Sequence, residues 1–150
     1  MNVMPENETL NMQGIGVIHT SYKAMKDCPS NSRFCTGDST IEILPSLADA
    51  MLDVQSATHL IVLYWLDQSD RSVLARPAKL DGVTRGAFAT RTHNRPNPIG
   101  FSVVKLLECN GTTLRTSGLD CLDGTALLDI KPYIANNDSY PEAVLAWNKS

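Results

Sequence analysis

The stretch FSVVKLLECNGTTLRTS (residues 101–117) holds the strongest local fold signal in this 150-residue chain. Two runs of alternating apolar residues, 101–109 and 112–117, are separated by Asn110-Gly111. A two-residue turn between paired strands needs positive φ at its central positions, which asparagine and glycine tolerate best. The sequence therefore predicts an antiparallel β-hairpin here.

Five further segments have the composition or the alternation of strands, whereas helical patterns are scarce. The predicted strands cover residues 15–19, 39–44, 59–66, 86–90 and 126–130, and helical periodicity is confined to 47–52 and 141–147. Strands that recur with short connections favour an antiparallel barrel or sandwich over a doubly wound α/β sheet. No Gly-x-Gly-x-x-Gly follows the first strand, so the usual Rossmann nucleotide site is absent. The sequence thus predicts a mainly β, non-Rossmann fold with a few short helices.

The length and the hydrophobic content of 43% are enough for one domain with an ordinary core. Residues 1–13 are polar and aperiodic, which predicts a flexible N-terminal arm before a single domain at 14–150. Residues 21–37 lack any regular pattern and predict a long loop, of a length that usually serves a site. No segment resembles a membrane helix or a signal peptide, so we expect a soluble cytoplasmic protein without membrane contact.

The charge pattern excludes a general attraction to nucleic acid and leaves room for a local one. The formal net charge is −3, from 16 acidic and 13 basic side chains. Basic residues gather in one part of the chain, where only Asp81 opposes them: Arg71, Arg76, Lys79, Arg85, Arg91 and Arg95. This cluster is either an anion-facing surface or an ordinary solvated face.

The four cysteines lack the spacing of a zinc knuckle or of a thioredoxin-type redox pair. Free thiols are therefore the simplest interpretation for Cys28, Cys35, Cys109 and Cys121. Cys28 and Cys35 flank a loop rich in Pro, Ser and Asn, so a local redox or metal pair is the alternative.

The segment RTHNRPNPIG (residues 91–100) is the densest group of chemically useful side chains. Its two prolines fix φ and remove backbone donors, which predicts a stiff, irregular loop rather than a helix or a central strand. Arginine binds carboxylates with two hydrogen bonds, and asparagine both donates and accepts, so the loop suits a ligand with carboxylate and ribose oxygens. The alternative is a rigid connector whose polar groups satisfy one another.

A second group of polar side chains lies in LDCLDGT (residues 119–125) and LDIKPY (residues 128–133). Asp123-Gly124 is a turn signal that places the aspartate at a loop tip. Asp123, Asp129 and Lys131 line one pocket in the first interpretation. In the second, they are a turn residue and an ordinary ion pair.

These segments carry a resemblance to a known family. The run GAFATRTHNRPNPIGFSVV (residues 86–104) resembles the pattern GVFATRSPxRPNPIGxSVV of the TsaA/YaeB-like family, and LDCLDGTALLDIKPY (residues 119–133) resembles its LDLLDGTPVLDIKPY. Weaker likenesses are Gly16 to His19 and His59 to Trp65. The characterised members of this family are tRNA N6-threonylcarbamoyladenosine methyltransferases (TrmO) that act beside the anticodon.

The resemblance implies a compact antiparallel β-barrel, a homodimer with cofactor sites near the subunit interface, and S-adenosylmethionine as the cofactor, with no metal. By motif, the cofactor would be held by Arg91, His93, Asn94, Arg95, Pro96, Asn97, Pro98, Ile99, Leu122, Asp123, Lys131 and Tyr133. Candidates for a catalytic role are Asn97, Asp123 and Lys131. A tRNA partner would meet its phosphates at Arg71, Arg76, Lys79 and Arg85, and their distance in sequence from the RPNPIG loop predicts that Arg71 and Arg76 leave cofactor binding unaffected.

Two departures from the family keep other functions open. Many tRNA-modifying members have PRQP in the loop after the first strand, where this chain has CPSNSRFC (residues 28–35), and the long members carry a second domain beyond the equivalent of Ser150. The alternatives are a methyltransferase for a small metabolite that uses the same cofactor pocket, and a non-catalytic S-adenosylmethionine-binding regulator.

Overall fold

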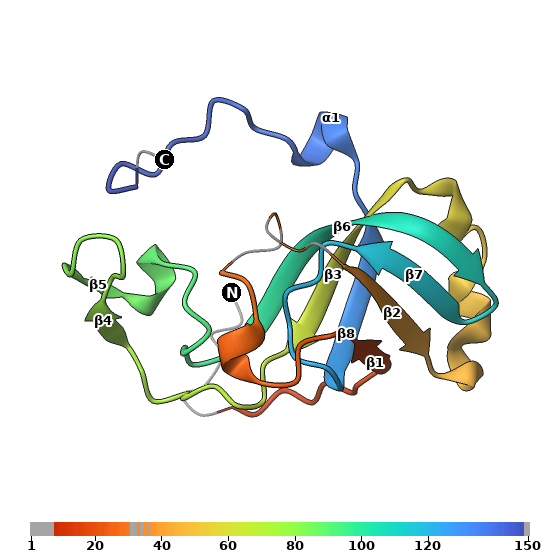
Figure 1. Cartoon of the computed structure of the whole chain (residues 1–150), viewed down its shortest axis with the longest axis horizontal. Helices are drawn as coiled ribbons and strands as arrows, with labels where there is room; N and C mark the ends of the chain where they lie inside the picture. Colours follow the sequence, from red (N-terminus) through yellow and green to blue (C-terminus); the bar gives the residue numbers. More distant parts are fainter. Residues whose placement is uncertain (1–7, 31–32, 34, 36, 149–150) are drawn as a thin grey trace.

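The strands of this protein alternate between buried and exposed side chains, as expected for a sheet with one face in the core. The structure is a computed structural model that describes residues 8–30, 33, 35 and 37–148. In β1 and β2 nearly every second side chain points into the core. Six strands close into an antiparallel barrel in the order β1-β2-β7-β6-β3-β8 (Figure 1). Their bounds are β1 (Gly16–His19), β2 (Asp38–Ile43), β3 (His59–Trp65), β6 (Ile99–Asn110), β7 (Thr113–Ser117) and β8 (Thr125–Pro132). The predicted fold class and the barrel are confirmed.

Branched aliphatic side chains fill the barrel interior. Each strand contributes at least one side chain that is almost fully buried, among them Ile18, Ile41, Leu60, Val62, Val104, Leu114 and Leu127. Burial of one such side chain contributes about 1.5–3 kcal/mol to folding. The interior is thus a packed core, and any ligand must bind at the ends or on the outside of the barrel.

The predicted hairpin joins β6 to β7, with its turn displaced by one residue. Asn110 pairs with Thr113, so Gly111 and Thr112 are the two central residues. Gly111 has φ of +60°, while Asn110 keeps an ordinary negative φ. A turn with glycine at its first central position needs positive φ only there, which explains the displacement.

The two longest connections of the barrel, residues 20–37 and 66–98, lie at the same end. At one end, which we call the long-loop end, lie residues 20–37, 66–98 and 118–124. The opposite, short-loop end holds the β6–β7 turn and two 3-10 helices, η3 (Pro45–Met51) and η4 (Val54–Ser56). The predicted helix over residues 47–52 is therefore a 3-10 helix that begins at Pro45.

The connection 66–98 folds beside the barrel as a separate small hairpin (Figure 1). It consists of β4 (Ala75–Pro77) and β5 (Thr84–Gly86), followed by the single 3-10 turn η5 (Ala87–Ala89). A strand was predicted over residues 86–90, and that prediction is wrong beyond Gly86. The reason is a local turn, in which the Thr90 amide donates to the Ala87 carbonyl (3.2 Å).

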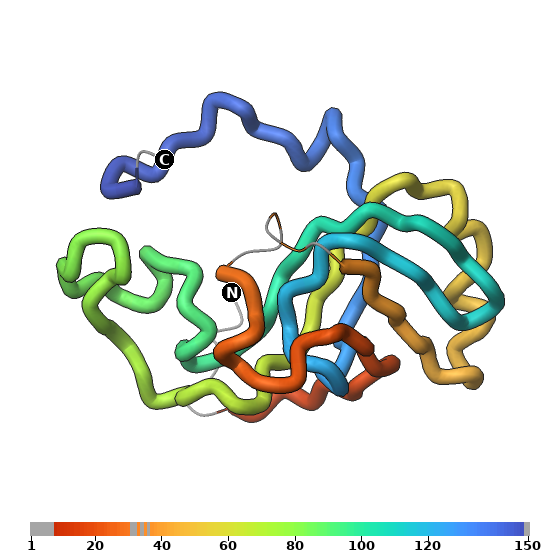
Figure 2. The backbone as a smooth tube through the Cα atoms, viewed as in Figure 1, coloured from red at the N-terminus to blue at the C-terminus, as the bar shows by residue number. Residues whose placement is uncertain are grey.

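The C-terminal segment also differs from its prediction. The one described α-helix is the short α1 (Ala135–Asp138), and residues 141–147 are not helical. They run back from the end of β8 towards the β4–β5 hairpin (Figure 2). The Trp147 indole donates to the Ala89 carbonyl (3.1 Å), and the Arg85 guanidinium lies 4.3 Å from the ring centroid. These tertiary contacts override a weak helical periodicity.

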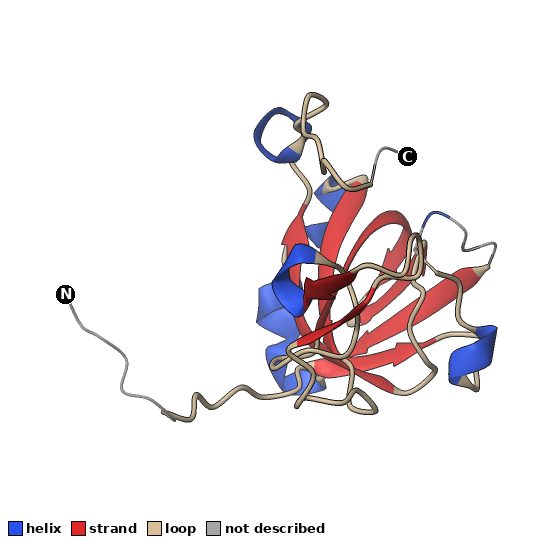
Figure 3. Cartoon of the chain, turned by 90° about the vertical axis from the view of Figure 1, so that its left-hand side faces the viewer, coloured by secondary structure: helices blue, strands red, loops and turns tan. Residues whose placement is uncertain are grey.

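The N-terminal part of the chain lies outside the barrel. Residues 8–14 are exposed and extend away from the strands (Figure 3), whereas residues 1–7 of the predicted arm lie outside the described residues. Regular pairing begins where the Ile15 amide donates to the Leu127 carbonyl (2.9 Å). Among the described residues, no helix is long and apolar enough to cross a membrane.

One close approach in the barrel gives a test of the fold. Gly100 stands directly opposite Tyr64, and a Cβ at Gly100 would lie 2.1 Å from a Tyr64 ring carbon. We expect Gly100→Ala to destabilise the protein by about 1–3 kcal/mol or more, because the buried ring must move. Denaturant unfolding measures the change. Gly37→Ala is the matched control, since a Cβ there meets nothing within 4 Å; equal stability of the two variants would contradict the packing described.

Candidate functional site

The three segments that sequence analysis singled out meet at the long-loop end of the barrel. Residues 91–98 lead into β6, residues 119–124 lead into β8, and residues 20–37 connect β1 to β2. In the antiparallel barrel, the starts of β2, β6 and β8 lie at the same end as the ends of β1, β3 and β7. This end is therefore the candidate site.

The proline loop is held in shape by its own side chains. Arg95 donates to the carbonyls of Thr90 (3.2 Å) and Thr92 (3.0 Å), and the Asn94 side-chain oxygen accepts from the Asp70 amide (2.8 Å). Asn94 and Arg95 thus do what the rigid-connector interpretation predicted. The loop ends earlier than predicted, because Ile99 and Gly100 already pair in β6 with Trp65 and Tyr64.

Pro98 anchors the loop to the barrel. Its ring is buried, and its carbonyl accepts from the Leu66 amide (2.9 Å) just beyond the end of β3. Asn97 is exposed, and Pro96 is half-buried. The loop therefore presents Asn97 on a fixed backbone.

Arg71 supports this loop from a distant part of the sequence. Its Nε donates to the Pro96 carbonyl (2.8 Å) and its Nη2 to the Asn97 Oδ1 (3.1 Å), while its guanidinium lies 5.3 Å from the Trp65 ring centroid. The expectation that distance in sequence separates Arg71 from the loop is therefore wrong. The connection after β3 brings Arg71 back onto the loop, where two of its five N–H donors are in use.

The remaining basic residues differ in their availability. Arg85 forms a bidentate ion pair with Asp81 (2.7 and 2.9 Å), which lowers the pKa of that carboxyl to about 2. The Arg91 guanidinium lies 5.6 Å from the Phe101 ring centroid. Arg76 and Lys79 are exposed. Burial, with the charges of these two groups, lowers the pKa of His93, so the imidazole is neutral at pH 7.

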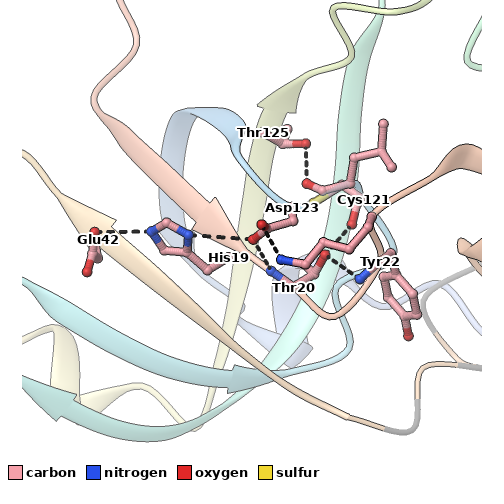
Figure 4. Close-up of polar contacts among 9 residues, drawn as sticks. His19, Thr20, Tyr22, Glu42, Cys121, Asp123 and Thr125 are labelled. Atoms are coloured by element: carbon pink, nitrogen blue, oxygen red, sulfur yellow. Dashed lines mark hydrogen bonds and ion pairs between the residues drawn. The ribbon is translucent and has the colours of Figure 1, made fainter.

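Asp123 joins the loop after β1 to the loop before β8 (Figure 4). Its Oδ1 accepts from the Thr20 amide (3.1 Å), and its Oδ2 pairs with the Lys23 ammonium. The His19 Nδ1 lies 3.5 Å from the same carboxylate, and the other ring nitrogen contacts Glu42 (3.1 Å). The Lys23 hydrogen bond is the largest cause of the lowered pKa of Asp123, so this carboxylate is ionised at neutral pH.

The backbone around Asp123 has the predicted turn. Gly124 has φ of +83°, and its amide donates to the Ile18 carbonyl (2.8 Å). The Leu122 carbonyl accepts from the Thr125 hydroxyl (2.6 Å), which fixes the carbonyl beside Asp123. The LDGT segment is thus a tight turn that positions one ionised carboxylate.

Lys131 and Tyr133 lie at the opposite end of the barrel. Lys131 pairs with Ile61 in the register, near the start of β3, and its Nζ lies 3.0 Å from Asp129 Oδ2. The Tyr133 amide donates to the His59 carbonyl (3.0 Å). Eight residues of strand span about 26 Å, so one chain does not bring Lys131 to Asp123. Within the chain, the ion-pair interpretation describes Asp129 and Lys131.

A buried polar group beneath the site was missed by sequence analysis. The Tyr64 hydroxyl donates to Asp120 Oδ1 (2.7 Å) and lies 2.8 Å from the Ser102 hydroxyl. Burial, with the negative charge of Asp120, raises the pKa of Tyr64, so the phenol keeps its proton. The available signal was a tyrosine in the inward phase of an apolar strand, because a buried phenol needs a polar partner.

The four cysteines are free thiols, as the simpler interpretation predicted. Cys35 donates to the Leu119 carbonyl (3.0 Å), and burial is the largest cause of the raised pKa values of Cys28 and Cys35. Cys121 is buried, and its pKa is raised to about 12. The thiols of Cys28, Cys35 and Cys121 are therefore protonated at neutral pH. No cluster of three metal-ligating side chains occurs in the part of the chain that is described.

A groove of about 660 Å³ lies at the other end of the barrel, between β8 and the two 3-10 helices. Its lining is mostly apolar and includes Leu47, Met51 and Ile130, together with Asp129 and Tyr133. The RPNPIG loop and the LDGT segment do not contribute to it. It is thus distinct from the candidate site.

Comparisons with known proteins agree on one family. The family model described as the tRNA-methyltransferase O N-terminal domain matches residues 17–139. A probable S-adenosyl-L-methionine-binding protein from Archaeoglobus fulgidus is 46% identical over 91% of this chain and 37% of its own length. A tRNA (adenine(37)-N6)-methyltransferase from Escherichia coli is 35% identical over 91% of this chain and 63% of its own length.

A solved structure supports the same assignment. The crystal structure of TrmO from Pseudomonas aeruginosa has a TM-score of 0.80 and 30% identity, and it covers 97% of this chain and 65% of the crystallised one. The chain thus spans less than two thirds of the length of each of these three proteins.

The Asp123 network gives a prediction for stability. A carboxylate with a lowered pKa stabilises the folded state above the unfolded-state pKa of about 3.9, and this contribution is lost as the pH falls through the folded-state value. Asp123→Asn should therefore be less stable than the wild type at pH 7, and the difference should shrink at about pH 2.5. Urea unfolding at both pH values measures it.

A double-mutant cycle with Lys23→Met identifies the cause. The coupling between the two positions should be present at pH 7 and should fade in acid, because only the ionised carboxylate attracts the ammonium. A pH-independent loss of stability in Asp123→Asn would contradict this assignment.

Proposed function

This chain belongs to the tRNA-methyltransferase O N-terminal domain family, and from that membership we propose that it methylates N6 of adenosine 37 in tRNA, beside the anticodon. The acceptor in this proposal is the threonylcarbamoylated base. The methyl donor is S-adenosylmethionine, the molecule that the printed name of the Archaeoglobus relative mentions. The observation that carries the proposal is the convergence of the RPNPIG loop and the LDGT turn at one end of the barrel. Such an enzyme works where tRNA is found, in the cytoplasm.

The residues at the long-loop end fit this cofactor. The exposed Asn97 amide both donates and accepts, which suits ribose hydroxyls, and the ionised Asp123 suits an ammonium or a hydroxyl group. The buried Pro98 and the hydrogen-bonded Leu122 carbonyl fix the backbone of the two segments, and the half-buried side chains of Pro96 and Leu122 offer apolar contact for a purine. Further members of the proposed set are Arg91, His93, Asn94, Arg95, Pro96 and Ile99.

The chemistry needs positioning above all. When bound, S-adenosylmethionine supplies an electrophilic methyl group on a sulfonium. The protein then has to hold the acceptor nitrogen in line with that group and exclude competing water. Arg71 and Arg95 hold the loop that carries Asn97 in place before binding, which lowers the cost of ordering it. The N6 proton has to leave as the new bond forms, and the ionised Asp123 in the LDGT turn is the acceptor proposed for it.

Arg76 and Lys79 are the phosphate-binding residues of this proposal. Both are exposed, whereas Arg71 and Arg85 already bind groups within the protein. A net-acidic chain depends on such a local patch for tRNA binding. Of the four basic residues that the sequence predicted to contact RNA, two therefore remain in the proposal.

A homodimer is the assembly that we propose, docked through the outer wall of β3 and β6. Directly opposite residues of paired strands share a face. On the outward face the pairs are apolar: Ile61 with Val103, Leu63 with Phe101, and Trp65 with Ile99. Phe101 and Ile99 remain 45% and 40% exposed. A wall that is apolar both inside and outside the barrel requires a cover.

The dimer also gives Lys131 and Tyr133 a place in the site. Lys131 pairs with Ile61 and therefore points outward on the same wall. A twofold axis that lies in the plane of the wall and crosses the strands turns the second copy end for end. Lys131 and Tyr133 of one copy then lie beside the long-loop end of the other, so each cofactor site includes residues of both copies.

The name of the Archaeoglobus relative supports a second candidate, an S-adenosylmethionine-binding protein without transfer activity. The same pocket would serve in both cases, but methyl transfer also requires access for tRNA. The two candidates therefore differ in whether the wild-type protein methylates threonylcarbamoylated tRNA or only binds the cofactor.

The main test separates the two binding sites. Asn97→Ala should weaken S-adenosylmethionine binding by about 2- to 12-fold, as loss of one neutral hydrogen bond does, and should leave tRNA binding unchanged.

Arg76→Glu combined with Lys79→Glu should leave cofactor affinity unchanged. It should lower the slope of log tRNA affinity against log salt by about 1.4–1.8, the share of two phosphates. Calorimetry and filter binding measure the two affinities.

Methylation by the wild-type protein decides between the candidates. Transfer of a labelled methyl group to threonylcarbamoylated tRNA supports the methyltransferase. Cofactor binding without transfer supports the second candidate, and absence of cofactor binding contradicts both. Arg71→Ala tests the loop support, since it should weaken cofactor binding although Arg71 contacts the loop and the Trp65 ring and is not itself in the proposed cofactor set.

Purified heterodimers test the shared site. Asp123→Ala and Lys131→Ala homodimers should each have little activity, whereas a heterodimer of the two has one fully intact site and should recover about half of the wild-type activity. A heterodimer with two Asp123→Ala subunits carrying different tags is the control. Absence of recovery would show that Asp123 and Lys131 do not meet between copies.

A further inference from the structure

Phe88 is among the most exposed large apolar side chains of the described chain, at 84%. It sits on the 3-10 turn η5 (Ala87–Ala89), whose backbone is held on both sides. The Ala87 amide donates to the Leu74 carbonyl (2.8 Å), and the Ala89 carbonyl accepts from the Trp147 indole (3.1 Å). A fixed turn thus presents an aromatic ring to the solvent.

The hairpin that leads into this turn carries two cations. Gly86, at the start of the turn, pairs with Ala75, the neighbour of Arg76, and Lys79 follows at the tip of the same hairpin. Both Arg76 and Lys79 are exposed, and within the described ranges neither forms an ion pair. His93 faces both charges and is neutral at pH 7. The turn therefore combines a bare ring with two uncompensated cations.

This combination fits single-stranded RNA better than another protein surface. An apolar protein partner over Phe88 would remove water from Arg76 and Lys79 without replacing it, which is costly. An RNA loop supplies phosphates for the cations and the π-face of an unpaired base for the ring. The chemistry of the patch thus selects a strand with both charge and exposed bases.

We propose that Phe88 stacks on an unpaired base of the anticodon loop next to the base that is methylated, and so fixes the position of the loop over the site. This role rests on the proposed function and adds a positioning residue to it. Stacking on aromatic rings is the usual way in which proteins hold splayed loop bases, and it is independent of base identity. Arg76 and Lys79 then hold the backbone on either side.

The test compares four side chains at one position. Phe88→Ala and Phe88→Leu should lower kcat/KM for threonylcarbamoylated tRNA by about 5- to 150-fold, the range for loss of one stacked base. Phe88→Trp and Phe88→Tyr should retain activity, because they keep the π-face. Phe88→Leu separates stacking from mere apolar contact. Affinity for S-adenosylmethionine should be unchanged in all four, and Val144→Ala, equally exposed at 84%, is the matched control.

A second measurement reports stacking directly. An anticodon stem-loop with 2-aminopurine at one unpaired position at a time should lose fluorescence at one position on binding to the wild type, and keep it with Phe88→Leu. Wild-type-like kcat/KM and quenching in Phe88→Leu would overturn the proposal. So would a change of oligomeric state in Phe88→Ala, which would assign the ring to a contact between copies. If the wild type neither binds nor methylates tRNA, it is the proposed function that fails.

Discussion

The contact between Tyr64 and Gly100 is the constraint on which the candidate site depends. The tyrosine ring occupies the space that a Cβ at position 100 would fill, so β3 and β6 approach closely at the long-loop end. The phenol then reaches Asp120 and Ser102 and places the loop before β8 against these two strands. The Tyr64 contact thus holds Asp120, just before the LDGT turn, while hydrogen bonds to Ile18, Thr20 and Tyr22 hold the turn itself. The site is rigid because this polar group is buried and its partners are satisfied.

Local signals in the sequence were enough for the barrel and for most of its strands. The alternation of β2 and the apolar run of β3 are short-range patterns, and the glycine of the β6–β7 turn acts within its own hairpin. The failures are segments whose shape depends on distant contacts. Residues 86–90 form a turn held by Leu74, and residues 141–147 form turns rather than a helix, with the Trp147 indole bound at Ala89. The local sequence of these segments does not reveal which distant residues they contact.

The sequence identified the two motifs of the site but not the positions of their residues relative to one another. Both motifs lie at one end of the barrel, and the turn at Asp123-Gly124 follows from glycine chemistry. The last part of the second motif, Lys131 to Tyr133, lies one strand length away, because a β-strand carries neighbours in sequence to opposite ends of a barrel. Conversely, Arg71 lies far from the loop in sequence and contacts it in the structure. Distance along a chain is thus a poor guide to distance in a barrel.

The basic cluster shows why a charge count does not predict an RNA-binding surface. Of its guanidinium groups, that of Arg95 binds carbonyls of its own loop, that of Arg71 supports the loop, and that of Arg85 is paired with Asp81. Each of these groups already uses some of its donors within the protein, and the charge of Arg85 is neutralised by Asp81. Of the other three, Arg91 lies against the Phe101 ring, while Arg76 and Lys79 lie on the hairpin that precedes the exposed ring of Phe88. In a net-acidic protein, the division of cations between internal support and external contact decides where a polyanion can bind. That division follows from hydrogen-bond partners, which only the folded structure defines.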